Sequence, residues 1–189
     1  MDVEELKAKI ESGDMARSEI MKLRENCRKT LNDPSKQKNH DRALQFLEVT
    51  ESTTVPETRI EYIFMGYCPS GDIANRVDTG WFAGGFCNFN FLESQHQVDR
   101  FFEIVPGDIV ICKKRETFGE TMRIHAWGKV TKLRDSRANN RWLEMNWIVT
   151  DDPIIVPLMG CNATVNVRTL EQVEEAMPPE FWEWLEQTS

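Results

Sequence analysis

The spacing of the apolar residues changes once along this chain, and the change divides the chain into a helical part and a β-rich part. Up to about residue 50, apolar side chains recur every three or four positions, as in Ile20, Leu23, Cys27 and Leu31, which indicates amphipathic helices. The Thr-, Ser- and Pro-rich stretch TESTTVPE comes next, and strand-like segments dominate after it. The sequence therefore predicts a helical segment over residues 1–50 and a second domain over residues 57–189.

The second domain has five segments of strand character with helical segments among them. The predicted strands are RIEYIFMGY, GDIVICKK, MRIHAWGKVTKL, RWLEMNWIVT and NATVNV. The predicted helices are LESQHQVDRFFEI before the central strands, and RTLEQVEEAM and PPEFWEWLEQ at the end. Helices first, then strands with one inserted helix, then closing helices, are typical of an α+β fold with a mostly antiparallel sheet or small β-barrel.

Several functional classes are excluded by motifs that the sequence lacks. No apolar run approaches the 18 residues of a membrane helix, and the charged start MDVEELKAKIESGD is unlike a secretory signal, so we expect a cytoplasmic protein without membrane contact. The five cysteines form no CxxC pair, and each of the three histidines stands without a second ligand nearby. No GxGxxG or GxxxxGK[ST] motif is present. We expect neither a metal nor a cofactor.

The charges of the chain are unevenly distributed, although the formal net charge is -8. Residues 113–141 hold nine Lys and Arg against three acidic residues, whereas residues 151–189 hold one Arg against eight acidic residues. Such a segregation is compatible with a basic binding face on an acidic protein. Within this basic segment, the sequence predicts phosphate contacts for five residues: Lys113, Lys114, Arg115, Arg123 and Lys129.

The stretch TGWFAGGFCNFNF combines Trp81 and four phenylalanines with three glycines, and we expect it to lie in a long loop that follows the first strand. The glycines would leave Trp81 open as a wall on which a flat ligand stacks. In the later strand, Ile124, Ala126, Gly128 and Val130 are expected on the core face. Trp127 is expected on the opposite face, among basic residues.

Three segments of the second domain resemble the central hairpin of the PUA-like superfamily, and within it the EVE-like modules related to YTH domains. They are IVPGDIVICKK, IHAWGKVTKL and RWLEMNW, within about residues 95–150; the matching positions are Gly107, Asp108, Gly128 and Val130. The resemblance implies a pseudo-barrel that binds a modified or flipped base in an aromatic pocket, without catalysis. The residues that would form this ligand site are Trp81, Phe82, Phe86, Trp127 and Trp142 as the rings, with Asp78, Asn88 and Asn146 as polar groups.

Three functions remain open from the sequence. The first is a non-enzymatic module that binds a free nucleotide or a single-stranded or modified nucleic acid. The second is an adaptor whose helices at residues 1–50 bind a protein partner or a second copy of the chain. The third is a cysteine-dependent enzyme, since Cys112 and His125 are predicted to be cross-strand neighbours and an imidazole can activate a thiol.

Overall fold

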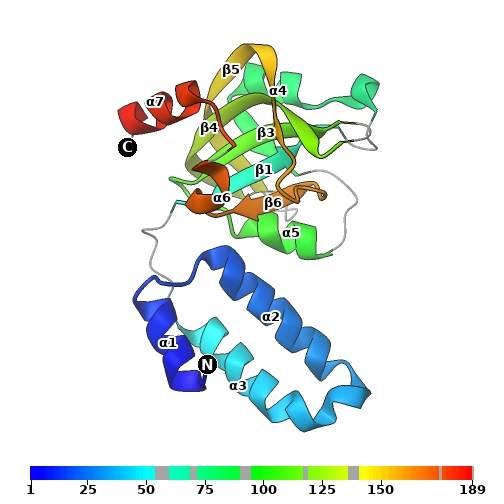
Figure 1. Ribbon diagram of the computed structural model, residues 1–189, viewed down its shortest axis with the longest axis vertical. Helices are drawn as coiled ribbons and strands as arrows, with labels where there is room; N and C mark the ends of the chain where they lie inside the picture. The colour runs from blue at the N-terminus through cyan, green and yellow to red at the C-terminus, as the bar shows by residue number, and fades with distance from the viewer. Residues whose placement is uncertain are drawn as a thin grey trace. The chain divides into compact units, whose positions relative to one another are not determined.

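The chain divides into two compact units, Met1–Ile60 and Glu61–Ser189. The computed structural model describes residues 1–53, 60–68, 72–89, 95–116, 119–135, 141–174 and 176–188 (Figure 1). Residue 57, the expected start of the second domain, lies outside these ranges. Each unit has its own hydrophobic core, and each is described by itself below.

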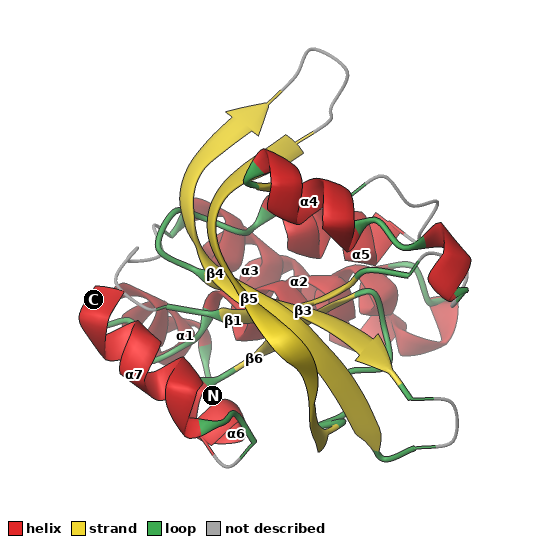
Figure 2. Cartoon of the chain, turned by 90° about the horizontal axis from the view of Figure 1, so that it is seen from above, coloured by secondary structure: helices red, strands yellow, loops and turns green. Residues whose placement is uncertain are grey.

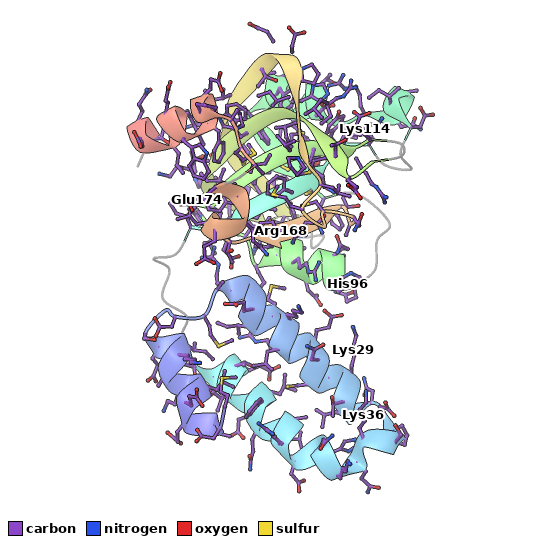
Figure 3. The ribbon with its side chains drawn as sticks, viewed as in Figure 1. Lys29, Lys36, His96, Lys114, Arg168 and Glu174 are labelled. Carbon is purple, nitrogen blue, oxygen red and sulfur yellow. The ribbon has the colours of Figure 1, made fainter. Side chains whose placement is uncertain are left out.

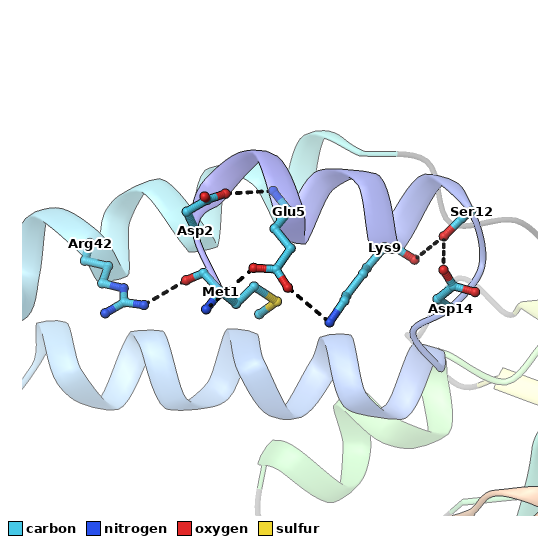
Figure 4. Close-up of polar contacts among 7 residues, drawn as sticks. All are labelled: Met1, Asp2, Glu5, Lys9, Ser12, Asp14 and Arg42. Atoms are coloured by element: carbon cyan, nitrogen blue, oxygen red, sulfur yellow. Dashed lines mark hydrogen bonds and ion pairs between the residues drawn. The ribbon is translucent and has the colours of Figure 1, made fainter.

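The first unit is helical, as the periodicity of residues 1–50 predicts. Its elements are α1 (Val3–Glu11), α2 (Arg17–Leu31), the short 3-10 helix η1 (Pro34–Asn39) and α3 (His40–Ser52). Asp2 caps α1, since its Oδ1 accepts a hydrogen bond from the Glu5 amide at 2.8 Å (Figure 4). Arg42 of α3 donates to the Met1 carbonyl at 2.9 Å and ties the start of the chain to this unit. The buried core is formed by Leu6, Ile10, Ile20, Cys27, Ala43 and Phe46.

The second unit is built on a six-stranded sheet. Its strands are β1 (Tyr62–Gly66), β2 (Phe86–Asn88), β3 (Ile109–Arg115), β4 (Thr121–Asp135), β5 (Arg141–Pro157) and β6 (Val165–Arg168). Their order is β2-β5-β4-β3-β1-β6, and all neighbours are antiparallel except β1 and β3, which are parallel. The predicted α+β class is confirmed. Among the described strands the edges β2 and β6 do not pair, so the sheet is open and does not close into a barrel.

Helices cover both faces of this sheet (Figure 2). One face packs against α4 (Asp78–Gly84) and α5 (Gln95–Phe102), which contribute Trp81 and Phe101 to its core. The other face packs against α6 (Leu170–Glu174) and α7 (Pro179–Thr188), which contribute Val173 and Phe181. The apolar residues of β1 and β3 therefore alternate between two cores and are buried on both sides.

The segment expected as a long loop between the first strand and the helix at residue 92 contains regular structure instead. A short 3-10 helix, η3 (Ile73–Asn75), precedes α4, and Gly85 ends α4 in the left-handed conformation at φ 64°. β2 follows at once and pairs with β5. The three glycines of this stretch thus belong to a helix and to its C-terminal cap, and not to an open ligand wall.

The β4–β5 pair has a large irregularity at His125. Ile124 pairs with Ile154 and Ala126 pairs with Val149, so the four residues Thr150–Pro153 lie opposite His125 alone. A bulge of this kind shifts the alternation of side chains between the two faces. Ile124 consequently faces the same core as Trp127, whereas Ala126 faces the other core. The expected placement of Ile124 beside Ala126 is wrong for this reason, whereas Trp127 does lie on the face opposite Ala126 and Val130, as expected.

Candidate functional site

A polar pocket of about 470 Å³ opens where the parallel strands β1 and β3 end. We name it the basic pocket, because Lys114 and Arg115 at the end of β3 lie in its wall (Figure 3 labels Lys114). In open sheets with parallel strands, ligands bind at the carboxyl ends of the strands. The complete lining is Gly66, Cys68, Lys113, Lys114, Arg115, Glu116, Asn162, Ala163 and Thr164.

Lys113 holds one wall of the basic pocket in place and does not reach its interior as a free cation. Its Nζ donates to the carbonyls of Cys161 and Ala163, at 2.7 and 2.5 Å, and its side chain is only 4% exposed. The Gly66 amide donates to the Thr164 carbonyl at 2.8 Å in the same wall. The expected phosphate contact of Lys113 is therefore replaced by a structural role. Strand alternation explains the difference, since Lys113 and Lys114 leave β3 on opposite faces.

Burial lowers the pKa of Lys113 to about 8 from its ordinary 10.5. Between these two values the unfolded chain binds the proton and the folded protein does not, so the free energy of unfolding rises with pH. We expect wild type to gain about 2 kcal/mol relative to Lys113→Met between pH 8 and 9.5. Urea unfolding of both proteins across this range measures the difference. A difference that stays constant with pH would contradict the assignment.

Lys114 and Arg115 are the two cations of the basic pocket whose side chains remain available to a ligand. Lys114 is half-buried and Arg115 is exposed, and neither has a hydrogen bond or ion pair among the described residues. Arg123 is the cross-strand neighbour of Lys114, and its Nε donates to Glu116 at 2.8 Å. The structure thus brings three of the predicted phosphate-contacting residues together. Lys129 lies elsewhere, because its Nζ donates to the Thr188 carbonyl at the end of α7.

A second group of polar side chains lies in the second unit outside the lining of the basic pocket, and we name it the Tyr67 cluster: Tyr67, Arg76, Asp78 and His125. Asp78 is fully buried and accepts from Arg76 Nε at 2.7 Å and from Arg76 Nη2 at 2.5 Å. The same guanidinium lies 5.5 Å from the centre of the Tyr67 ring, and the His125 ring meets Tyr67 edge-on at 5.0 Å. Asp78 was expected to select a ligand, but its carboxylate is occupied by Arg76.

The electrostatics of this region do not favour nucleophilic catalysis. Burial raises the pKa of the Cys112 thiol well above its ordinary value, and Cys112 is fully buried opposite Ala126. Burial, followed by the charge of Arg76, lowers the pKa of His125. Burial also raises the pKa of Cys68, although the charge of Lys114 opposes this shift. The Cys112 thiol is enclosed and its pKa is raised, and Cys112 pairs with Ala126 and not with His125, so the hypothesis of a Cys112 and His125 enzyme has no activated nucleophile.

Two of the expected stacking residues belong to the cores. Trp81 is 1% exposed, and its Nε1 donates to Asn88 Oδ1 at 2.9 Å, so both side chains bind each other inside the protein. Trp127 is 2% exposed and packs edge-on against Phe181 of α7 at 5.6 Å. Burial removes both tryptophans as open platforms, which corrects the expectation drawn from the glycine-rich stretch. Trp81 is buried because α4 is helical and turns this side chain inward.

Phe86 and Trp142 lie far from the basic pocket, and Phe82 is not part of its lining. Phe86 stacks on Trp142 with ring centres 4.4 Å apart, and Trp142 is 37% exposed. Trp142 pairs with Arg134 of β4, whereas Lys114 pairs with Arg123 of β4. Arg123 and Arg134 are roughly 35 Å apart along the strand. Phe82 packs against Trp147 at 5.3 Å, and Asn146 is exposed on β5. The predicted rings and cations therefore do not form one site.

No sequence motif indicates that Tyr67, Cys68 and Arg76 belong to this region of the protein. Tyr67 and Cys68 follow the first strand directly, and Arg76 precedes Asp78 by two residues. A cation two positions from a carboxylate is common on protein surfaces, so its burial could not be anticipated. Asn162 and Ala163 also line the pocket, and Lys113 binds this segment through the carbonyls of Cys161 and Ala163.

A comparison with protein-family models finds no match, and comparisons with curated proteins and with solved structures also find none. Among the helices of the described ranges, none is long and apolar enough to cross a membrane. The described residues also hold no group of three or more His, Cys, Asp or Glu side chains suited to a metal ion.

Proposed function

We propose that the protein binds a phosphate-bearing ligand with a nucleobase in the basic pocket, without catalysing a reaction. The ligand is a nucleotide or a short single-stranded nucleic acid. The observation that carries this proposal is the pair Lys114 and Arg115, which line the basic pocket without an acidic partner among the described residues. Cationic side chains that are not neutralised from within the protein favour an anionic ligand.

The size of the basic pocket favours one nucleotide unit over a long polymer. Its volume of about 470 Å³ falls within the range of roughly 300–1,000 Å³ that is usual for pockets of small molecules. The net charge of -8 also disfavours extended contact with a duplex, whose phosphates are themselves anionic. In contrast to the sequence-based hypothesis, this proposal assigns no role to Trp81 or Trp127.

Replacement of Lys114 by alanine is expected to weaken nucleotide binding about tenfold, because one charge-assisted contact to phosphate is lost. Isothermal titration with AMP, ATP and a short single-stranded oligonucleotide measures the change, at two salt concentrations. For the oligonucleotide, the slope of log affinity against log salt should fall by about one. Lys132→Ala is the matched control: it removes the same charge from an exposed position of β4 that lies outside the basic pocket.

Equal losses in Lys114→Ala and Lys132→Ala would mean that only the overall charge of the protein matters, and would overturn the proposed site. The salt dependence distinguishes the two ligand classes, since a nucleic acid neutralises several cations and a free nucleotide only a few. Membership of the PUA-like superfamily, the cytoplasmic location and the absence of a cofactor stay predictions.

The adaptor hypothesis requires a docking surface on the helices of the first unit. A groove of about 210 Å³ does lie between α2 and α3. However, three of its apolar residues, Cys27, Ala43 and Phe46, are each less than a tenth exposed and belong to the core of the first unit. Nothing in the groove specifies the chemistry of a partner.

A further inference from the structure

The lining of the basic pocket carries more positive than negative charge. It contains three cationic side chains: Lys113, Lys114 and Arg115. Its one carboxylate, Glu116, already accepts a hydrogen bond from Arg123 at 2.8 Å. Burial lowers the pKa of Lys113 to about 8, which leaves this side chain mostly protonated at neutral pH. The lining therefore has an excess of two positive charges, although the net charge of the chain is -8.

A further cation, Arg168 of β6, acts on the same region from outside the lining (Figure 3). Its guanidinium donates to the Met159 carbonyl at 2.8 Å and to the Val167 carbonyl at 2.6 Å. After burial, the charges of Arg168 and Arg115 contribute to the lowered pKa of Lys113, because like charges disfavour its protonated form. An anion that binds among these cations relieves their mutual repulsion.

Hydrogen bonds join the segment 161–164 to both parallel strands. The Lys113 ammonium of β3 and the Gly66 amide of β1 donate to three of its carbonyls: those of Cys161, Ala163 and Thr164. A polymer cannot pass between the segment and the strands at these positions. The bonded carbonyl oxygens are also engaged by donors, which reduces their repulsion of the oxygens of a phosphate. This arrangement favours the end of a ligand over the interior of a polymer.

We propose that the basic pocket binds a terminal phosphate, a phosphate monoester, in preference to the phosphodiester inside a nucleic acid strand. The inference rests on the proposed function and narrows its ligand to a nucleotide with a terminal phosphate or the phosphorylated end of a short single strand. A monoester carries about two negative charges at neutral pH and has three free oxygens, whereas a diester carries a single charge. The monoester therefore matches the excess charge of the lining and offers Lys114 and Arg115 one more acceptor.

AMP and its methyl ester at the phosphate test this preference by isothermal titration, because the ester lacks one charge and one free oxygen. Wild type is expected to bind AMP about tenfold more tightly than the ester, the effect of one charge-assisted contact. A short oligonucleotide with phosphorylated ends should likewise bind about tenfold more tightly than the same sequence with hydroxyl ends. The net charge of -8 opposes the more highly charged ligand, so the overall charge of the protein does not produce this preference.

Two variants of the basic pocket locate the cause of the preference. In Lys114→Ala and in Arg115→Ala, the ratio of the two affinities should fall to about threefold or less, because each variant removes a cation that contacts the additional charge. Lys132→Ala is the matched control, since it removes a charge outside the lining, and it should keep the tenfold ratio.

The titrations separate failure of this inference from failure of the proposed function. Equal or tighter binding of the methyl ester by wild type would overturn the inference and leave the proposed function standing, provided that Lys114→Ala still weakens the binding of AMP. A ratio that stays near that of wild type in both Lys114→Ala and Arg115→Ala would also overturn the inference. Absence of any nucleotide binding would overturn both proposals.

Discussion

Replacing Arg76 with methionine is expected to lower the free energy of unfolding by about 3 kcal/mol, the lower end of the usual 3–5 kcal/mol for breaking a buried ion pair. Asp78 is fully buried, and Arg76 supplies both hydrogen bonds to its carboxylate. The variant leaves this carboxylate without its counter-charge. The guanidinium side chain is 32% exposed, so solvent screening places the effect at the lower end. Guanidinium chloride unfolding followed by tryptophan fluorescence measures it.

Two further variants isolate the cause. Arg76→Met combined with Asp78→Leu should recover most of the lost stability, because no buried charge then remains. Arg123→Met removes an arginine whose partner Glu116 is 30% exposed, and it should cost less than about 1 kcal/mol. If Arg76→Met were as stable as Arg123→Met, the buried pair would not have the role that its geometry indicates.

Gly128→Ala is expected to destabilise the protein by about 3 kcal/mol, the upper end of the range for overpacking. A Cβ at this position would lie 2.5 Å from the Asn146 carbonyl oxygen and 3.1 Å from its carbon. Both atoms are backbone of β5, which is paired with β4 at this point, so neither can rotate away. A melting curve of the variant, recorded by circular dichroism, gives the shift.

Gly80→Ala is the matched control for Gly128→Ala, and its expected effect has the opposite sign. A Cβ at Gly80 meets no atom within 4 Å. Gly80 lies within α4, where alanine is favoured over glycine by up to about 1 kcal/mol. A stabilised Gly128→Ala, or a Gly80→Ala that loses as much stability as Gly128→Ala, would contradict the close approach of β4 and β5.

Much of the fold follows from local patterns, because strands and helices leave different periodicities in the sequence. The segment GDIVICKK has a continuous apolar run, IVIC, and forms β3, which is buried on both faces, and the helical stripes of residues 1–50 form α1 to α3. The segment around α4 was not predicted as a helix. Gly80 and Gly84 disfavour helix locally, but the burial of Trp81 and its bond to Asn88 outweigh that preference.

The candidate site was predicted less completely than the fold. Lys114 and Arg115 could be found from charge density, whereas the role of Lys113 depends on carbonyls nearly fifty residues later in the chain. The irregularity at His125 also reversed the expected face of Ile124, and such a break in pairing cannot be read from alternation alone. The burial of Tyr67 and of the Arg76 and Asp78 pair arises only from the assembled sheet and helices.

The four residues opposite His125 also interrupt an exposed edge of the sheet. Beyond its short pairing with β2, β5 has no second neighbour among the described strands, and Ile148, Val149 and Ile155 are exposed along it. Such an edge would normally recruit strands from other molecules and begin aggregation. Between these residues, Asp151 and Asp152 add charge, and Pro153 removes a hydrogen-bond donor. The same irregularity that turns Ile124 to its core therefore also interrupts the regular edge that another strand would pair with.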